Sequence, residues 1–150
     1  MIALLRASDA GQALVEMAIA LPVLLLLLIG VIDISLSVNA YITVTNASRE
    51  GATYMVSHPS AAPSAVASAV TDRIAPLLPS NVTVTASYYN GATFTPWPAG
   101  GLASSSPSAT SVPVRVDVSY PWSATTILIG QFFGGTSRTF HGTSTMVVVW

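Results

Sequence analysis

The sequence has 150 residues, enough for one domain of ordinary size with a segment to spare. Charged residues make up only 7% of it, against roughly 25% in a soluble domain, and five arginines without any lysine form no basic patch, which argues against nucleic-acid binding. The absence of cysteine excludes a disulfide scaffold, a thiol nucleophile and thiolate metal sites.

The most apolar segment lies near the N-terminus. From Met17 to Ile32 every residue is apolar apart from Gly30 and the imino acid Pro22. As a helix, residues 12–32 would be ~31 Å long and would match a hydrocarbon core of ~30 Å. The Leu, Ile and Val residues of this run favour insertion by about 5 kcal/mol, more than the roughly 2.5–3.5 kcal/mol that a charge costs at the bilayer centre. The sequence therefore predicts a membrane-spanning helix.

Two ordinary explanations of this segment are open. The first is a cleaved secretory signal, with residues 1–11 as its n-region and small residues at Ser35, Ser37 and Ala40 as the cleavage zone. The second is an uncut membrane anchor, in which Glu16 only marks the membrane interface.

A third interpretation uses the spacing of a glycine and a glutamate. Gly11 precedes Gln12, and Glu16 is the fifth residue after Gly11, with the apolar helix following at once. This spacing resembles the type IV prepilin processing signal. The wider segment "GQALVEMAIALPVLLLLLIG" with the later "ASREGA" resembles the TadE-like family of minor pilins or pseudopilins. The residues that match are Val15, Glu16, Ala18, Leu21 and Pro22, followed by Ala47, Arg49, Glu50, Gly51 and Ala52.

The resemblance implies a structural role in a Tad-type pilus. A prepilin peptidase would cut between Gly11 and Gln12 and remove the leader 1–11. The new amine of Gln12 would then pair with the Glu16 carboxylate of a neighbouring subunit and favour correct register. The implied partners are the membrane, the peptidase, other pilins and pilus assembly proteins. The implied location is the cytoplasmic (inner) membrane or the surface pilus, with a single span and an extracytoplasmic C-terminal domain.

Beyond the membrane segment, two helices are expected. Polar residues at steps of three or four, from Ser35 to Thr53, predict that the first helix continues to about residue 56. A second, shorter helix is expected over 62–75, because Pro63 suits a first helical position and Val66, Val70 and Ile74 are four residues apart.

The rest of the chain alternates with the period of a strand. Residues 82–89, 112–120 and 138–149 are expected to form half-buried strands. The Gly/Ser/Pro-rich stretch 90–111 is expected to be a long loop, in which Trp97 either contacts another subunit or packs into the domain. Phe132 and Phe133 are expected to serve the core. These elements predict an α+β, pilin-like fold, with residues 57–150 as the extracytoplasmic domain.

The titratable residues do not form an enzyme motif. His58 and His141 stand alone, and the sequence has no HExxH, no GxSxG and no glycine-rich phosphate loop. Arg115 and Asp117 share one face of a predicted strand, where a cross-strand ion pair is expected. The sequence therefore predicts a protein that is not an enzyme and that has no cofactor.

Overall fold

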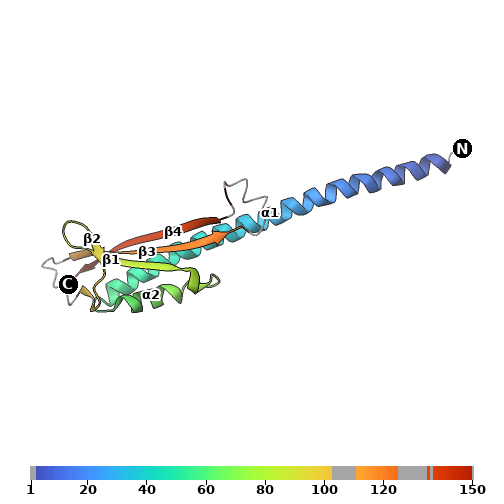
Figure 1. The fold of residues 1–150 in the computed structure, drawn as a ribbon. Helices are drawn as coiled ribbons and strands as arrows, with labels where there is room; N and C mark the ends of the chain where they lie inside the picture. The colour runs from blue at the N-terminus through green and yellow to red at the C-terminus, as the bar shows by residue number, and fades with distance from the viewer. Residues whose placement is uncertain (1–2, 103–110, 125–134, 136, 150) are drawn as a thin grey trace. The chain divides into compact units, whose positions relative to one another are not determined.

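The computed structural model describes residues 3–102, 111–124, 135 and 137–149, and within these ranges side chains from residue 11 onward. The chain divides into two compact units: Met1–Leu36 with Ala124–Thr136, and Ser37–Ser123 with Ser137–Trp150. The elements are α1 (Ala3–Ser57), α2 (Pro63–Thr71), a 3₁₀ turn η1 (Pro79–Asn81), β1 (Thr83–Tyr89), β2 (Phe94–Pro96), β3 (Ser111–Ser123) and β4 (Ser137–Val149) (Figure 1). This is the α+β arrangement that the sequence predicted.

Helix α1 is longer than the membrane segment alone. It continues through Pro22 and past Asp33, and it ends at Ser57, just before His58 and Pro59. A residue before proline is disfavoured in helical conformation, which explains this end point. Several hydroxyl residues after Asp33 donate to the carbonyl four residues earlier, as Thr45 does to Tyr41 at 2.9 Å. These bonds satisfy the hydroxyl groups of serine and threonine, two residues whose intrinsic helix propensity is low.

Helix α2 is shorter than expected. Pro63 stands at its start, as predicted, but the helix ends at Thr71 instead of residue 75. The chain then continues in tighter turns, with the Ile74 N–H donating to the Thr71 carbonyl at 3.3 Å. Pro76 disfavours helical conformation at residue 75, so the last predicted turn does not form as α-helix. Ile74 is nevertheless buried, which explains why it fitted the apolar spacing.

The strands form one antiparallel sheet in the order β2-β1-β3-β4. The three predicted strands are present as β1, β3 and β4, and β2 was not predicted. The central strand β3 sets the register, with Val116 opposite Ala86 on one side and opposite Ser144 on the other. Because side chains alternate along a strand, this register places the apolar residues of β1 and β3 on one face.

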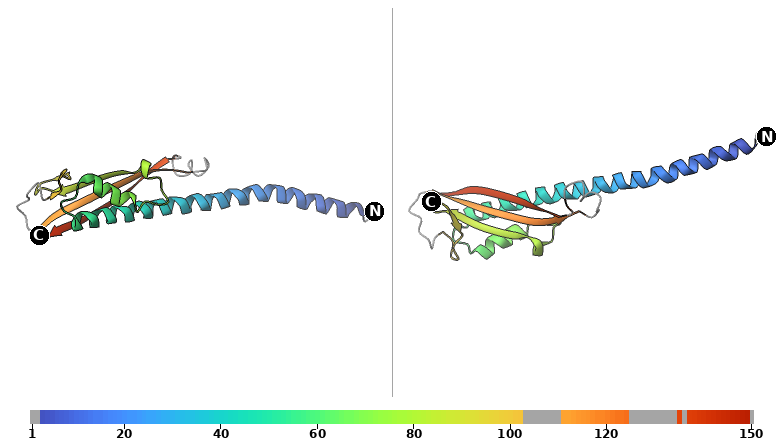
Figure 2. Two further views of the ribbon diagram at one scale, coloured as in Figure 1. Left: turned by 90° about the horizontal axis from the view of Figure 1, so that it is seen from below. Right: turned by 45° about the horizontal axis from the view of Figure 1, so that its top comes forward.

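That face carries the core of the second unit. Residues 37–57 of α1 lie against it together with α2, as the views from different sides show (Figures 1 and 2). Most core residues come from α1, α2 and β3, with Val148 of β4 and residues of the connecting segments added; they include Val44, Ala47, Met55, Val66, Val70, Val112, Val114, Val116 and Val118. Four successive inward valines of β3 are fully covered, which confirms the alternation read from the sequence.

The stretch after β1 is more ordered than a loop. The Asn90 side chain accepts hydrogen bonds from the backbone N–H groups of Ala92 and Thr93, and this turn leads into β2. Trp97 is buried, and its Nε1 donates to the Ala61 carbonyl at 2.8 Å. Trp97 therefore packs into the domain. The rest of the expected loop, 103–110, and the residues Phe132 and Phe133 lie outside the described residues.

Candidate functional site

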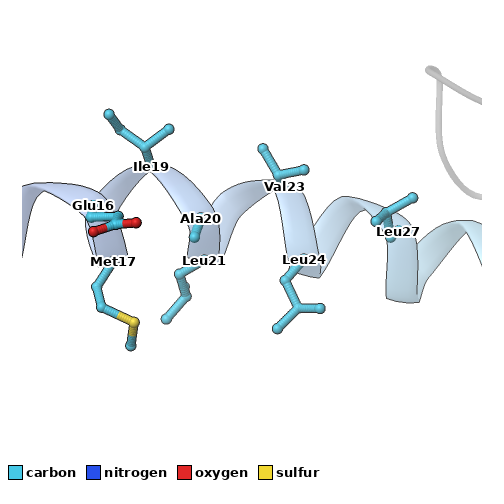
Figure 3. Close-up of a pocket in the computed structure, with 8 residues that line it drawn as sticks. All are labelled: Glu16, Met17, Ile19, Ala20, Leu21, Val23, Leu24 and Leu27. Atoms are coloured by element: carbon cyan, nitrogen blue, oxygen red, sulfur yellow. The ribbon is translucent and has the colours of Figure 1, made fainter. Parts of the chain in front are cut away.

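The candidate site is the N-terminal part of α1, and Glu16 is its charged residue. The Glu16 side chain is exposed and is followed along the helix by exposed apolar residues. A shallow surface on this segment is lined by Glu16, Met17, Ile19, Ala20, Leu21, Val23, Leu24 and Leu27 (Figure 3). Every lining residue except Glu16 is apolar. The carboxylate is thus the one polar group at the edge of an apolar helix surface.

The small side chain of Ala20 makes this surface concave. Ala20 lies one helical turn after Glu16, on the same side of α1. Figure 3 shows Ile19 and Val23 pointing to one side of Ala20, and Met17 and Leu21 pointing to the other. A neighbouring helix can therefore approach α1 closely next to the carboxylate, because small residues allow close packing of helix backbones.

Gly11 and Gln12 are also placed on α1. The helix begins at Ala3 and runs through both residues, and both are exposed. A Cβ atom at residue 11 would have no neighbour within 4 Å outside the adjoining helix backbone, so the space beside this glycine is open. Gln12 and Glu16 are four residues apart and lie on the same face of the helix.

Helix α1 is long and apolar enough to cross a membrane. In the most apolar stretch of the described helix, only 6% of the residues are buried inside the structure. The core helix of a soluble protein would have most of that surface covered. The exposed residues include Leu24, Leu27 and Val31, each more than half exposed. An apolar surface of this size has to be covered by lipid or by partner helices.

The "ASREGA" element lies in the second unit and has a packing role. Ala47 and Ala52 are fully buried, and Gly51 faces α2 and β3, where an added Cβ would come within 2.6 Å of Val70 Cγ2. The carboxylate of the element is not part of this packing. Glu50 lies at the surface, where its side chain forms an exposed ion pair with Arg73 at 3.5 Å. The small residues of this element thus let α1 lie close to its neighbours.

The expected ion pair on β3 is not formed. The guanidinium of Arg115 lies over the Phe94 ring at 3.6 Å, and Asp117 accepts a hydrogen bond from Thr143 at 2.6 Å. Arg115 and Asp117 are two residues apart on one strand, so their side chains point to the same face of the sheet. Each of them contacts a different neighbour. The prediction missed this because β2, which carries Phe94, was not foreseen.

The other titratable groups of the described residues form no metal site, although Asp117 and His141 line one small pocket on the sheet. Among the described residues, no group of three or more His, Asp or Glu side chains is placed to hold a metal ion. His58 stacks on Tyr54 with ring centroids 4.4 Å apart. Asp33, which the sequence did not single out, is almost completely buried, at 1% exposed. Nothing in the spacing around Asp33 distinguishes it from the polar residues of the exposed helix face.

Comparison with known proteins bears on the same segment. Residues 11–53 match the family model of TadE-like proteins, which confirms the resemblance read from the sequence. The match begins at Gly11 and includes both Glu16 and the "ASREGA" element. No curated protein and no solved structure matches the chain. The family and the apolar helix together support a single-pass membrane protein associated with a Tad pilus.

Proposed function

We propose that the chain is a minor pilin or pseudopilin of a Tad-type pilus and that a prepilin peptidase cuts it between Gly11 and Gln12. One observation carries this proposal: Glu16 is the single carboxylate on an exposed apolar helix surface, five residues after an unshielded glycine. The proposed parts are a leader 1–11, a membrane-spanning and continuing helix 12–56, and an extracytoplasmic domain 57–150.

Gly11 suits the position before the cut for a physical reason. The peptide bond after it belongs to α1 in the uncut chain, so cleavage requires the helix to open locally. Glycine weakens a helix interior by about 1 kcal/mol relative to alanine. It also has no side chain that could hinder binding of the opened segment to the peptidase. The helix therefore opens most readily where the peptidase has to bind.

The cut changes the charge of the site. It removes Arg6 and Asp9 with the leader and creates an amine on Gln12. Because Gln12 and Glu16 are one turn apart on the same face, the carboxylate of the same chain can neutralise this amine before assembly. When helices stack in parallel, the carboxylate of a neighbour takes over that role. An unpaired charge in an apolar surrounding is costly, so registers in which every amine keeps a carboxylate partner, its own or a neighbour's, are favoured over the others.

The surroundings of this site define the partners. The apolar surface around Ala20 would receive the helix of another pilin, and pilus assembly proteins would take the subunit from the membrane. The proposed location before assembly is the cytoplasmic membrane, with residues 57–150 outside it. The proposed role is structural, and it needs neither a cofactor nor a catalytic residue.

A second candidate is a permanently anchored extracytoplasmic binding module. It is favoured by the continuity of α1 through Gly11 and by the leader, whose one arginine is offset by one aspartate. The test is the intact mass of the protein extracted from membranes of cells with and without an active prepilin peptidase. A species that begins at Gln12 only when the peptidase is active supports the pilin. A species that retains residues 1–11 in both strains supports the anchor, and a start after residues 35–40 indicates a secretory signal.

A further inference from the structure

The amine that the proposed cut creates on Gln12 is the single cation of a long segment. The chain has no lysine, and the arginines that remain after the cut all lie at residue 49 or later. Residues 12–48 therefore carry no positive side chain, although they carry two carboxylates, Glu16 and Asp33. The charge balance of this part of α1 depends on one amine.

The side chain of Gln12 carries a group that can remove this amine. The side-chain amide is exposed and, among the residues that the structure describes, it forms no hydrogen bond. In the uncut chain the backbone nitrogen of Gln12 is a peptide nitrogen inside α1 and is not nucleophilic. The cut turns it into an amine at the start of a helix, where N–H groups have no acceptor within the helix. No hydrogen bond then holds the amide and the amine of Gln12 apart.

The reaction between these two groups is a closure of Gln12 on itself. An α-amine is partly neutral near neutral pH, and the neutral form is the nucleophile. It attacks Cδ of the side-chain amide, so that an N–Cδ bond forms and the Cδ–Nε2 bond breaks. The proton given up by the amine leaves with Nε2 as ammonia, and no atom is oxidised or reduced. The product is a lactam without a charge.

Glu16 is the residue that both slows this closure and suffers from it. Gln12 and Glu16 are one helical turn apart on the same face of α1. A carboxylate at that position favours the protonated amine, which cannot attack. Once the lactam has formed, Glu16 has lost the amine of its own chain as a partner. A neighbouring cyclised subunit offers no amine either, so the carboxylate stays unpaired in an apolar surrounding.

We propose that Gln12 is a modification site of the mature chain, where the side-chain amide closes on the new amine with loss of ammonia. The cyclised subunit lacks the cation that pairs with Glu16 and is excluded from the pilus. Pairing with Glu16 slows the closure and keeps the subunit competent for assembly. This chemistry requires the cut after Gly11 and therefore rests on the proposed function.

The absence of lysine allows a direct test, because the amine of Gln12 is the single primary amine in residues 12–150. The full mature chain is purified in detergent from a peptidase-expressing strain and incubated at neutral pH. Closure lowers the intact mass by one ammonia and removes the reaction with an amine-specific label. Gln12→Ala is the matched control, since it keeps the amine and has no amide. A synthetic peptide of residues 12–17, too short for a stable helix, gives the rate of closure without the helical pair.

We expect the wild-type chain to lose both ammonia and label, more slowly than the peptide, and Gln12→Ala to keep its label. Glu16→Gln should close about twofold faster than wild type, as an exposed pair one turn apart on a helix implies. In cells, the cyclised form should be present in the membrane and strongly depleted from sheared pili or cross-linked pilin complexes.

Three results would overturn parts of this scheme. Wild type that keeps its label like Gln12→Ala, while the peptide closes, refutes the modification. Slower closure of Glu16→Gln than of wild type means that the carboxylate promotes the reaction, which refutes its protective role. Equal fractions of cyclised chain in membranes and in pili refute the exclusion from the pilus. The failure of the proposed cut is a separate result, because then no species begins at Gln12 and no amine exists there to close.

Discussion

Gly142 of β4 lies directly against the backbone of Val44 in α1. A Cβ atom at residue 142 would be 2.7 Å from the Val44 carbonyl oxygen and 3.0 Å from the Cα of Thr45. The contact joins β4, a strand at the edge of the sheet, to the C-terminal part of α1. Since the clashing atoms belong to the backbone, no side-chain rotation can relieve the overlap. The glycine sets how close the helix and the sheet can come.

Replacing Gly142 by alanine should therefore destabilise the domain. A glycine inside a strand is intrinsically unfavourable, so the substitution would help an isolated strand by up to about 1 kcal/mol. Overpacking against a rigid backbone costs about 1–3 kcal/mol or more, and this is the larger effect. We expect a net loss of about 1–2 kcal/mol in urea unfolding of the full chain in detergent. Thr145→Ala, at an exposed position of β4, should change stability by less than about 0.5 kcal/mol. Equal effects of the two substitutions would contradict the close contact.

Gly51→Ala tests the same principle where side chains make the contact. An added Cβ would lie 2.6 Å from Val70 Cγ2 and 3.0 Å from Val116 Cγ1. The gain in helix propensity, about 1 kcal/mol, opposes an overpacking cost of about 1–3 kcal/mol. We expect a net destabilisation in the same unfolding assay. Val70→Ala removes the closest methyl group, so the double variant should be more stable than the sum of the two single changes predicts. Simple additivity would mean that residues 51 and 70 do not compete for space.

These two glycines show why part of the structure could be predicted and part could not. The alternation of valines in "VPVRVDV" already separates the two faces of β3, and the apolar run already predicts a membrane helix. Period and composition are local properties, so a sequence displays them directly. The role of Gly142 depends on Val44, nearly a hundred residues away, and no local pattern encodes that contact. β2 was missed for a related reason: only three residues pair, and the Asn90 turn aligns them.

The candidate site also has features that the sequence displays and features that only the fold reveals. The spacing of Gly11 and Glu16 is visible in the sequence, and the family match starts at that glycine. The "ASREGA" element is equally visible, but only the fold reveals that Gly51 faces α2 and β3 and that Ala47 and Ala52 are buried. The ring contacts of Phe140 with Tyr41 and Trp122 were not foreseen, because these three residues come from three separate elements.

Trp97→Phe measures the hydrogen bond that holds the β2 region to the segment between α1 and α2. The substitution keeps an aromatic ring but removes the donor to the Ala61 carbonyl. Leaving a buried acceptor unsatisfied costs about 1–3 kcal/mol; because Ala61 is only partly buried, we expect a loss at the lower end of that range, about 1 kcal/mol, in thermal or urea unfolding. Leu78→Ala, at a residue that is 61% exposed, is the control and should have an effect below about 0.5 kcal/mol. A neutral Trp97→Phe would show that the indole bond does not support the fold.

Gly11→Ala addresses the proposed cut. The substitution strengthens the helix by about 1 kcal/mol at the point where it has to open, and it places a methyl group beside the scissile bond. We expect a reduction of about tenfold or more in the rate at which a peptidase-expressing strain converts the chain to the form beginning at Gln12, measured by pulse labelling and mass. Gly30→Ala is the matched control within the same helix and should be processed at the wild-type rate. Normal processing of Gly11→Ala would place the cut elsewhere or remove it.

Glu16→Gln tests the charge pair without changing the shape of the side chain. The glutamine cannot neutralise the amine of Gln12, so assembly should suffer while membrane insertion, which the apolar residues drive by about 5 kcal/mol, should not. We expect the variant to be found in the membrane at the wild-type level and to be strongly depleted from sheared pili or from cross-linked pilin complexes. Glu16→Asp, which keeps the charge on a shorter side chain, should recover part of the incorporation.

Glu50→Gln is the control for loss of a carboxylate from α1, since its exposed pair with Arg73 contributes at most about 1 kcal/mol. Full incorporation of Glu16→Gln would show that the carboxylate does not govern subunit register.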